Sequence, residues 1–177
     1  MLYGDSAPGG RLPVSFAAES AYPTTASERF PGEDGVVEYS EGCRVGYRHF
    51  EASDDGAVYP FGHGESYASF AYRGAEQVDA STVRATVANT AERPGREVVQ
   101  AYVRPADDAN GDAPVRDLAG FQSVHLDAGE AVTVEVTLAN DAFRRYEDGW
   151  QEREGPFVVE LARSAGDVRA TVPFERP

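Results

Sequence analysis

Lysine and isoleucine are absent from this chain of 177 residues, and cysteine occurs only once. A single cysteine cannot form an intrachain disulfide, so a disulfide-stapled scaffold is excluded, and so is a cysteine-based zinc cluster. Cys43 stands beside Arg44, a setting that can activate a thiol. An inert and partly buried cysteine is the interpretation that we favour.

Long hydrophobic runs are missing too. No stretch approaches the ~18 apolar residues that a membrane-spanning helix needs, so no membrane partner is expected. Residues 2–11 are glycine-rich and lack a basic start, so they do not have the pattern of a signal peptide. The sequence leaves the location of the protein open, with the cytoplasm preferred.

Positive charge is scarce. The chain has 30 Asp and Glu residues against 16 cationic side chains, all of them arginine, and its formal net charge is -14. Such a surface repels phosphates, so no nucleic-acid partner is expected. An acid-rich composition without lysine resembles that of proteins from halophilic archaea, because at ~1 M salt a Debye length of ~3 Å removes most carboxylate repulsion. The alternative is an ordinary acidic protein from a GC-rich genome.

The composition changes near residue 65. Residues 1–65 are rich in glycine, proline, serine and acidic residues and show almost no periodicity. This predicts an extended, irregular segment that does not fold on its own. Short alternating apolar runs begin at about residue 66, and no amphipathic helix of normal length is expected.

The second part predicts about seven strands. Residues 132–138 show the clearest period of two, and residues 98–103 form a continuous apolar run typical of a central strand. The other runs lie at residues 67–72, 83–87, 118–126, 157–161 and 168–172. Residues 141–146 are expected to hold one short helical turn. The predicted fold class is all-β, an antiparallel immunoglobulin/fibronectin type III-like β-sandwich preceded by an extended irregular segment.

Two motifs in the first part stand out, Gly10-Arg-Leu-Pro13 and Tyr59-Pro-Phe-Gly-His-Gly64. With residues 39–48 between them, they resemble the end of the α/β sandwich domain and the linker of glycoside hydrolase family 3, the β-glucosidase and β-xylosidase family. Glu65 departs from that family, which usually has leucine there. Residues of the second part that fit the family are Asn89, Gly95, Glu97, Gln100, Tyr102, Leu118, Phe121, Trp150 and Phe157.

The resemblance implies a division of the chain. Residues 1–65 would be the tail of the α/β sandwich domain plus the linker, and residues 66–177 a complete fibronectin type III-like domain. The implied partners are the catalytic domains of a family 3 glycosidase, in cis or as a separate chain, and the full enzyme would hydrolyse β-glucosides or β-xylosides. The family's catalytic Asp and acid/base Glu have no matching motif here. We therefore expect no catalytic, cofactor-binding or metal-binding residue, and no hydrolysis by this chain alone.

Three linker residues have both a functional and a structural interpretation. Glu41 lies near arginines that could tune a catalytic carboxyl, but a structural carboxylate paired with arginine is favoured. Arg48 is expected to anchor the linker to the catalytic domains. His63 lies between two glycines, which should allow a tight path in which His63 makes a structural hydrogen bond.

Two other patterns are incomplete. His49 and His125 have no arrangement of serine, cysteine or aspartate that would indicate a catalytic triad. Asp108, Asn110 and Asp112 have the alternate spacing of a calcium loop, but alanine replaces the glycine and the glutamate that such a loop requires. An acidic surface loop is expected there.

Aromatic residues of the second part indicate an alternative function. Tyr102, Tyr146 and Trp150 could stack on sugar rings, which makes carbohydrate a candidate partner. In a sandwich of this size they are more often core or interface residues, and Trp150 is expected to pack beneath the turn at residues 152–155. A free-standing carbohydrate- or protein-binding module is the alternative, although such a module would have no reason to keep the two family motifs.

Overall fold

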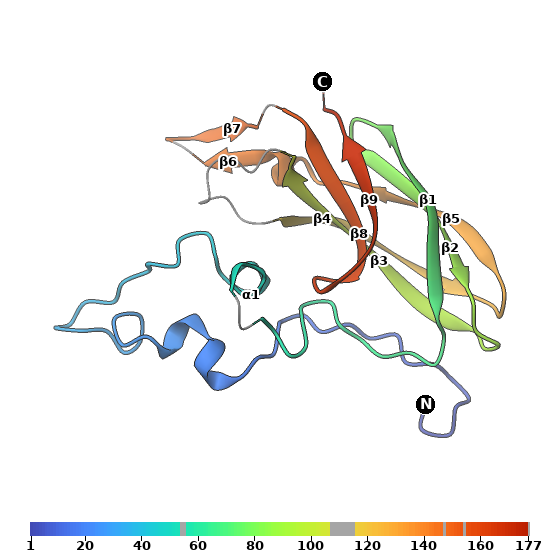
Figure 1. Cartoon of the computed structure of the whole chain (residues 1–177), viewed down its shortest axis with the longest axis horizontal. Helices are drawn as coiled ribbons and strands as arrows, with labels where there is room; N and C mark the ends of the chain where they lie inside the picture. The colour runs from blue at the N-terminus through green and yellow to red at the C-terminus, as the bar shows by residue number, and fades with distance from the viewer. Residues whose placement is uncertain (54–55, 107–115, 147, 154, 177) are drawn as a thin grey trace.

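Two antiparallel sheets face each other in the computed structural model, which describes residues 1–53, 56–106, 116–146, 148–153 and 155–176. The first sheet has the order β1-β2-β5 and the second the order β4-β3-β8-β9 (Figure 1). Their strands are β1 (Phe70–Asp79), β2 (Thr82–Asn89), β3 (Gly95–Pro105), β4 (Asp117–Leu126), β5 (Ala131–Thr137), β8 (Phe157–Ser164) and β9 (Asp167–Phe174). The all-β sandwich expected from the alternating runs is confirmed.

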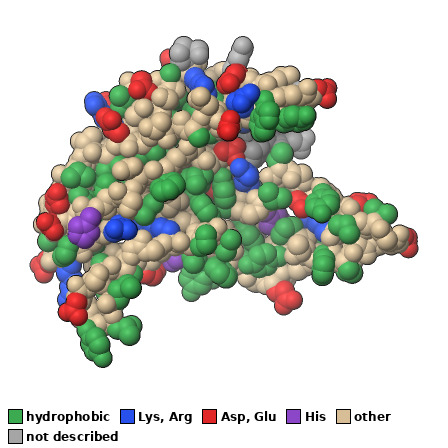
Figure 2. All heavy atoms as spheres, turned by 180° about the vertical axis from the view of Figure 1, so that it is seen from behind, with side chains coloured by type: hydrophobic (Ala, Val, Ile, Leu, Met, Phe, Trp, Pro, Cys, Tyr) green, Lys and Arg blue, Asp and Glu red, His purple; other side chains and the backbone are tan. Residues whose placement is uncertain are grey.

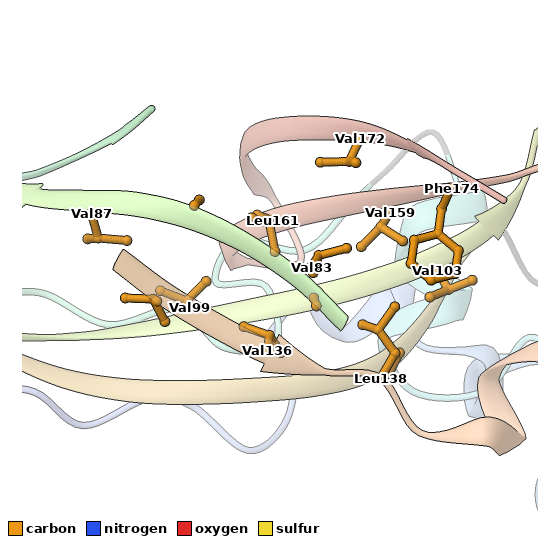
Figure 3. Close-up of a cluster of buried hydrophobic side chains, with 14 of the residues drawn as sticks. Val83, Val87, Val99, Val103, Val136, Leu138, Val159, Leu161, Val172 and Phe174 are labelled. Carbon is orange, nitrogen blue, oxygen red and sulfur yellow. The ribbon is translucent and has the colours of Figure 1, made fainter. Parts of the chain in front are cut away.

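The period of two places one face of each strand in the core. In β5, Val134 and Val136 are buried whereas Thr133 and Glu135 are exposed. Apolar side chains from both sheets meet between the layers (Figure 3). The labelled members are Val83, Val87, Val99, Val103, Val136, Leu138, Val159, Leu161, Val172 and Phe174.

Strand β3 is buried on both faces, as its continuous apolar run predicts. Val99, Ala101 and Val103 belong to the core between the sheets. Tyr102 points the other way and forms a second cluster with Ala162 and residues that precede the sandwich. The outer face of the four-stranded sheet is therefore covered by another part of the chain.

One hairpin was not predicted. Strands β6 (Arg144–Tyr146) and β7 (Trp150–Glu152) form a separate two-stranded sheet that projects from the sandwich (Figure 1). The expected helical turn is present as the 3-10 helix η3 (Asn140–Phe143) just before it. With only three residues in each strand, the hairpin shows too little alternation to be recognised from the sequence.

The chain before the first strand is irregular, as predicted. Residues 1–53 and 56–69, here called the N-terminal segment, contain two 3-10 turns, η1 (Glu19–Ala21) and η2 (Pro23–Thr25), and one short helix, α1 (Tyr47–Ala52). Figure 1 shows the segment running beneath the sandwich, with an arm that extends away from it. In the described part of the chain, no helix combines the length and the apolar character that crossing a membrane requires.

Candidate functional site: the docking segment

The N-terminal segment packs on the sandwich, and we therefore also call it the docking segment. Its two family-like motifs pair with each other. Phe16 and Tyr59 exchange backbone hydrogen bonds of 2.8 and 3.0 Å. Leu12 N–H donates to His63 O at 2.8 Å, and Gly62 N–H donates to Leu12 O at 2.8 Å. Residues 10–16 and 59–64 thus form a short antiparallel ladder, which we call the paired ribbon.

One face of the paired ribbon is bonded to the four-stranded sheet. Ala165 N–H, between β8 and β9, donates to Phe61 O at 2.8 Å. The Gln100 side chain lies beneath Gly62 and donates to its carbonyl at 3.4 Å, while accepting from the Tyr102 hydroxyl at 2.7 Å. Gly62 has a φ of +78°, and a Cβ there would collide with the Gln100 amide. The tight path expected from the glycines around His63 is therefore present.

A buried carboxylate ties the ribbon to the interior of the sandwich. Glu97 is fully buried and lies 2.9 Å from Arg11 and 3.3 Å from Arg163. It also accepts a hydrogen bond from the Tyr72 hydroxyl at 3.2 Å. Burial raises the pKa of the Glu97 carboxyl, and the two arginines offset part of that rise. Arg11 also donates to Gly64 O at 2.8 Å, so one side chain joins both strands of the ribbon to β3.

Helix α1 is held by a second ion cluster. Arg116 lies 2.8 Å from Glu51 on the helix and also pairs with Glu160 on β8. Its guanidinium lies 4.9 Å from the ring centroid of Tyr102. Burial raises the pKa of the Glu51 carboxyl, and the bond from Arg116 opposes this shift. A charge buried in this way is stable only while its partner stays in place.

Tyr47 and Arg48 attach the same helix to β4. The Tyr47 hydroxyl accepts the Leu118 N–H at 2.8 Å, and its ring stacks on Phe61 at 5.2 Å. Arg48 Nε donates to Asp117 at 2.6 Å. Within this chain, Arg48 therefore anchors helix α1 to the sandwich through Asp117. Its expected role in anchoring the linker to the catalytic domains stays a prediction.

The opposite face of the paired ribbon is apolar and open. Phe16 and Tyr59 are about half exposed, at 49% and 50%, beside a groove of about 730 Å³ that Leu12 and His63 also line. Figure 2 shows hydrophobic side chains gathered on the underside of the molecule, over the N-terminal segment. Other large exposed apolar residues of the segment are Met1, Leu2, Tyr3, Val14, Phe30, Val36, Val37, Tyr39, Val45, Val58 and Tyr67. Apolar side chains gathered on one exposed face, as at Phe16 and Tyr59, are typical of an interaction site.

The linker candidates have structural partners. Glu41 lies 3.6 Å from Arg29, which agrees with the structural interpretation of that carboxylate. His63 lies 3.3 Å from Glu65, and its ring centroid is 5.3 Å from that of Tyr59. His49 lies 3.0 Å from the Ala21 carbonyl.

Other sequence candidates lie apart from the ribbon. Cys43 is exposed, so the expectation of a partly buried cysteine was wrong; the residues of the linker around it are too sparse in apolar side chains to cover it. Asp108, Asn110 and Asp112 lie outside the described residues. Across the described ranges, no three His, Cys, Asp or Glu side chains are grouped as metal ligands would be.

The three aromatic candidates differ in their exposure to solvent. Tyr102 is fully buried under the linker and cannot stack on a ligand. Tyr146 and Trp150 are 68% and 61% exposed on the hairpin β6–β7. The expectation that Trp150 packs beneath the following turn was wrong, because its strand belongs to a hairpin that stands away from the core.

The β-sandwich and the segment packed against it indicate the class of protein to which this chain belongs. Residues 97–165 match the family model of the fibronectin type III-like domain. The chain corresponds, over nearly its whole length, to the C-terminal portion of glycoside hydrolase family 3 β-glucosidases.

Three relatives illustrate this correspondence. Thermostable β-glucosidase B from Acetivibrio thermocellus is 34% identical over 95% of the chain. A crystal structure of a β-glucosidase from Streptomyces venezuelae in complex with D-glucose is 34% identical over 98% of the chain, with a TM-score of 0.86. The GH3 β-glucosidase from Bifidobacterium adolescentis is 34% identical over 99%, with a TM-score of 0.84. The chain spans about a quarter of the length of these proteins, with 23%, 24% and 27% covered.

Proposed function

We propose that this chain is the structural, non-catalytic C-terminal module of a family 3 β-glycosidase and that it braces the catalytic domains, in cis or as a separate chain. One observation carries the proposal. The paired ribbon binds the sandwich through one face and exposes Phe16, Tyr59 and part of Leu12 on the other. A face of this kind fits burial against a further folded domain.

We propose the same division of the chain that the sequence indicated. Residues 1–65 belong to the α/β sandwich domain and its linker, and residues 66–177 form the fibronectin type III-like domain. Two observations support it. Every strand of the two main sheets lies between Phe70 and Phe174, and the large core cluster uses residues from Ala68 onward.

The chain alone should not hydrolyse glycosides. A retaining glycosidase needs one carboxylate as a nucleophile and a second carboxyl as an acid, roughly 5 Å apart. The buried carboxylate Glu97 and the half-buried Glu51 and Glu160 are instead each held by arginine. The test is turnover of aryl β-glucosides and β-xylosides in high salt. We expect no more product than with heat-denatured chain, and turnover above that background would overturn the assignment.

Bracing is tested with a point variant of the apolar face. The catalytic domains of a family 3 β-glycosidase from the same organism, produced without their C-terminal module, should survive heating longer when this chain is added. Phe16→Glu should abolish that protection, because it places a charge in an apolar interface. Phe121→Glu is the matched control, since Phe121 is 65% exposed on β4 and not part of the ribbon. Equal protection by both variants would exclude the ribbon as the docking face.

The alternative is a free-standing module that binds carbohydrate or protein. The exposed aromatic pair on β6–β7 favours it over a purely structural role. The two functions differ in what they need. Bracing requires the apolar face of the ribbon, whereas a free-standing module would bind its ligand unchanged in the Phe16→Glu variant.

We also propose that the protein works in concentrated salt, which its charge of -14 supports.

A further inference from the structure

The hairpin β6–β7 presents two aromatic rings side by side. Tyr146 and Trp150 are directly opposite each other in the strand register. Their ring centroids lie 5.7 Å apart with the planes at 80°, so the edge of one ring meets the face of the other. Both side chains remain about two-thirds exposed. Two exposed rings that contact each other form a joined apolar patch, and joined patches mark sites of interaction more often than single exposed residues do.

Charged side chains hold these rings in place. The Arg144 guanidinium lies 5.5 Å from the ring centroid of Trp150 and fixes the indole by a cation–π contact. Arg144 is itself held by Asp141 at 3.5 Å and by Glu152 at 3.4 Å. Arg176, near the end of β9, lies 3.7 Å from Glu152 and links the hairpin to the sandwich.

The base of the hairpin is anchored in the core. Arg153 N–H, just after β7, donates to the Phe143 carbonyl at 2.8 Å. Phe143 is buried and contacts the rings of Phe157 and Phe174. At the other end, Asp148 and Gly149, just before β7, have positive φ values of 49° and 141°. The aromatic pair is therefore preorganised, so little conformational entropy is lost when a ligand binds.

The chemistry of this surface fits a neutral pyranose. Exposed indole and phenol faces stack on the apolar C–H faces of a sugar ring, and tyrosine and tryptophan add a polar atom at the edge. Asp141 and Glu152 are 83% and 60% exposed in their side chains and can accept hydrogen bonds from sugar hydroxyls. Anionic ligands are disfavoured by the net charge of -14. β-Linked glucosyl units fit best, because all their ring substituents are equatorial and both ring faces are left apolar.

We propose that Tyr146 and Trp150 form a binding platform for β-linked gluco-oligosaccharides. This function goes beyond bracing, because it uses a different surface from the paired ribbon and needs no second domain. Trp150 supplies the main stacking face and Tyr146 the second wall. Arg144 is a positioning residue that acts through the indole.

The test uses the single tryptophan of the chain as its own reporter. Cellopentaose is titrated into the full 177-residue chain while tryptophan fluorescence and acrylamide quenching are followed. We expect a saturable change and shielding of the indole with a dissociation constant of about 1 mM or tighter. Tyr146→Ala should weaken binding at least about fivefold, which corresponds to losing part of one stacking contact. Phe121→Ala, which removes an equally exposed ring elsewhere, should bind like the parent chain.

The possible results separate this proposal from others. No fluorescence change with cellopentaose in a chain whose circular dichroism is native would overturn it, as would equal weakening by Tyr146→Ala and Phe121→Ala. Shielding of Trp150 by added catalytic domains, without a response to cellopentaose, would assign the hairpin to a protein interface instead. Phe16→Glu should leave cellopentaose binding unchanged, so a failure of bracing and a failure of the platform are distinguishable.

Discussion

Glu97 connects the docking segment to the core through a single carboxylate. Its three partners come from three parts of the chain, Arg11 in the ribbon, Tyr72 in β1 and Arg163 in β8. Because the group is buried, removing it takes away the carboxylate that Arg11 and Arg163 share, and Arg163 retains only the more distant Asp167 at 4.0 Å. Glu97 therefore holds the ribbon on the sheet together with the Gln100–Gly62 and Ala165–Phe61 hydrogen bonds.

Truncation of this residue should be costly. We expect Glu97→Ala to lower the free energy of unfolding by about 3–5 kcal/mol, because it removes the buried carboxylate that Arg11 and Arg163 share. Glu97→Gln should cost less, since it keeps an acceptor for Tyr72 and burial already favours a neutral group there. Urea unfolding at fixed salt measures both. Glu76→Ala, which breaks the exposed pair with Arg84, is the control and should cost under about 1 kcal/mol. Similar losses at positions 76 and 97 would contradict this account.

The raised pKa of Glu97 gives a pH dependence with a definite sign. A carboxyl whose pKa is higher in the folded than in the unfolded chain binds its proton more tightly when folded. The contribution of such a carboxyl to the free energy of unfolding is therefore largest below its pKa in the unfolded chain, about 4.3. This contribution is lost as the pH rises through its pKa in the folded chain. We expect the stability of the parent chain relative to Glu97→Gln to fall over that interval. Urea titrations from pH 4 upward test this, and a relative stability that rises with pH would contradict the assigned direction.

At the scale of elements, the linker and the four-stranded sheet form one unit. The outer face of β3 is covered by Phe61 and Gly62 on one side and by α1 on the other. The sequence predicted strands, turns and an irregular N-terminal segment correctly because period-two burial and glycine or proline signals are local. It did not predict α1 or the hairpin β6–β7, because short elements depend on tertiary contacts for their stability.

Two glycines allow the energetic cost of backbone strain to be measured apart from the cost of a steric clash. Gly62 and Gly129 have nearly equal φ values of 78° and 74°, but only at Gly62 would a Cβ collide with another residue. Gly129→Ala should cost about 1 kcal/mol from the positive φ alone. Gly62→Ala should cost about 1–3 kcal/mol more, because the new methyl group pushes the ribbon off Gln100. Thermal or urea unfolding of the two variants gives the difference directly. Equal losses would mean that the ribbon is not packed on the sheet in solution.

At the scale of the molecule, charge should make stability depend on salt. A net charge of -14 means that carboxylate repulsion acts against the compact state. Raising NaCl from about 0.1 M to about 1 M shortens the Debye length from ~10 Å to ~3 Å and screens that repulsion. We expect the Tm to rise by several degrees over this range. Scanning calorimetry in NaCl, with sucrose as an uncharged control, tests the effect. A Tm that falls with NaCl would mean that internal pairs such as Glu51–Arg116 outweigh surface repulsion.

The candidate site shows what a linear pattern can and cannot reveal. The motifs at residues 10–13 and 59–64 identified the docking segment, but nothing in their sequence says that they pair with each other. The functional interest of Tyr146 and Trp150 was visible as residue type alone. Their exposure, and the burial of Tyr102, follow from which side of a strand each residue occupies and from what covers that side.

The sequence by itself determined the all-β class, the irregular first part and the family correspondence, because these depend on local periodicity, composition and ordered motifs. The tertiary structure decided which residues meet. Arg11 reaches Glu97 across 86 positions, and Arg48 finds Asp117 across 69. Such pairings depend on how the ribbon lies over the sheet, and no local pattern encodes that placement, because the partners are brought together only when the sandwich has formed.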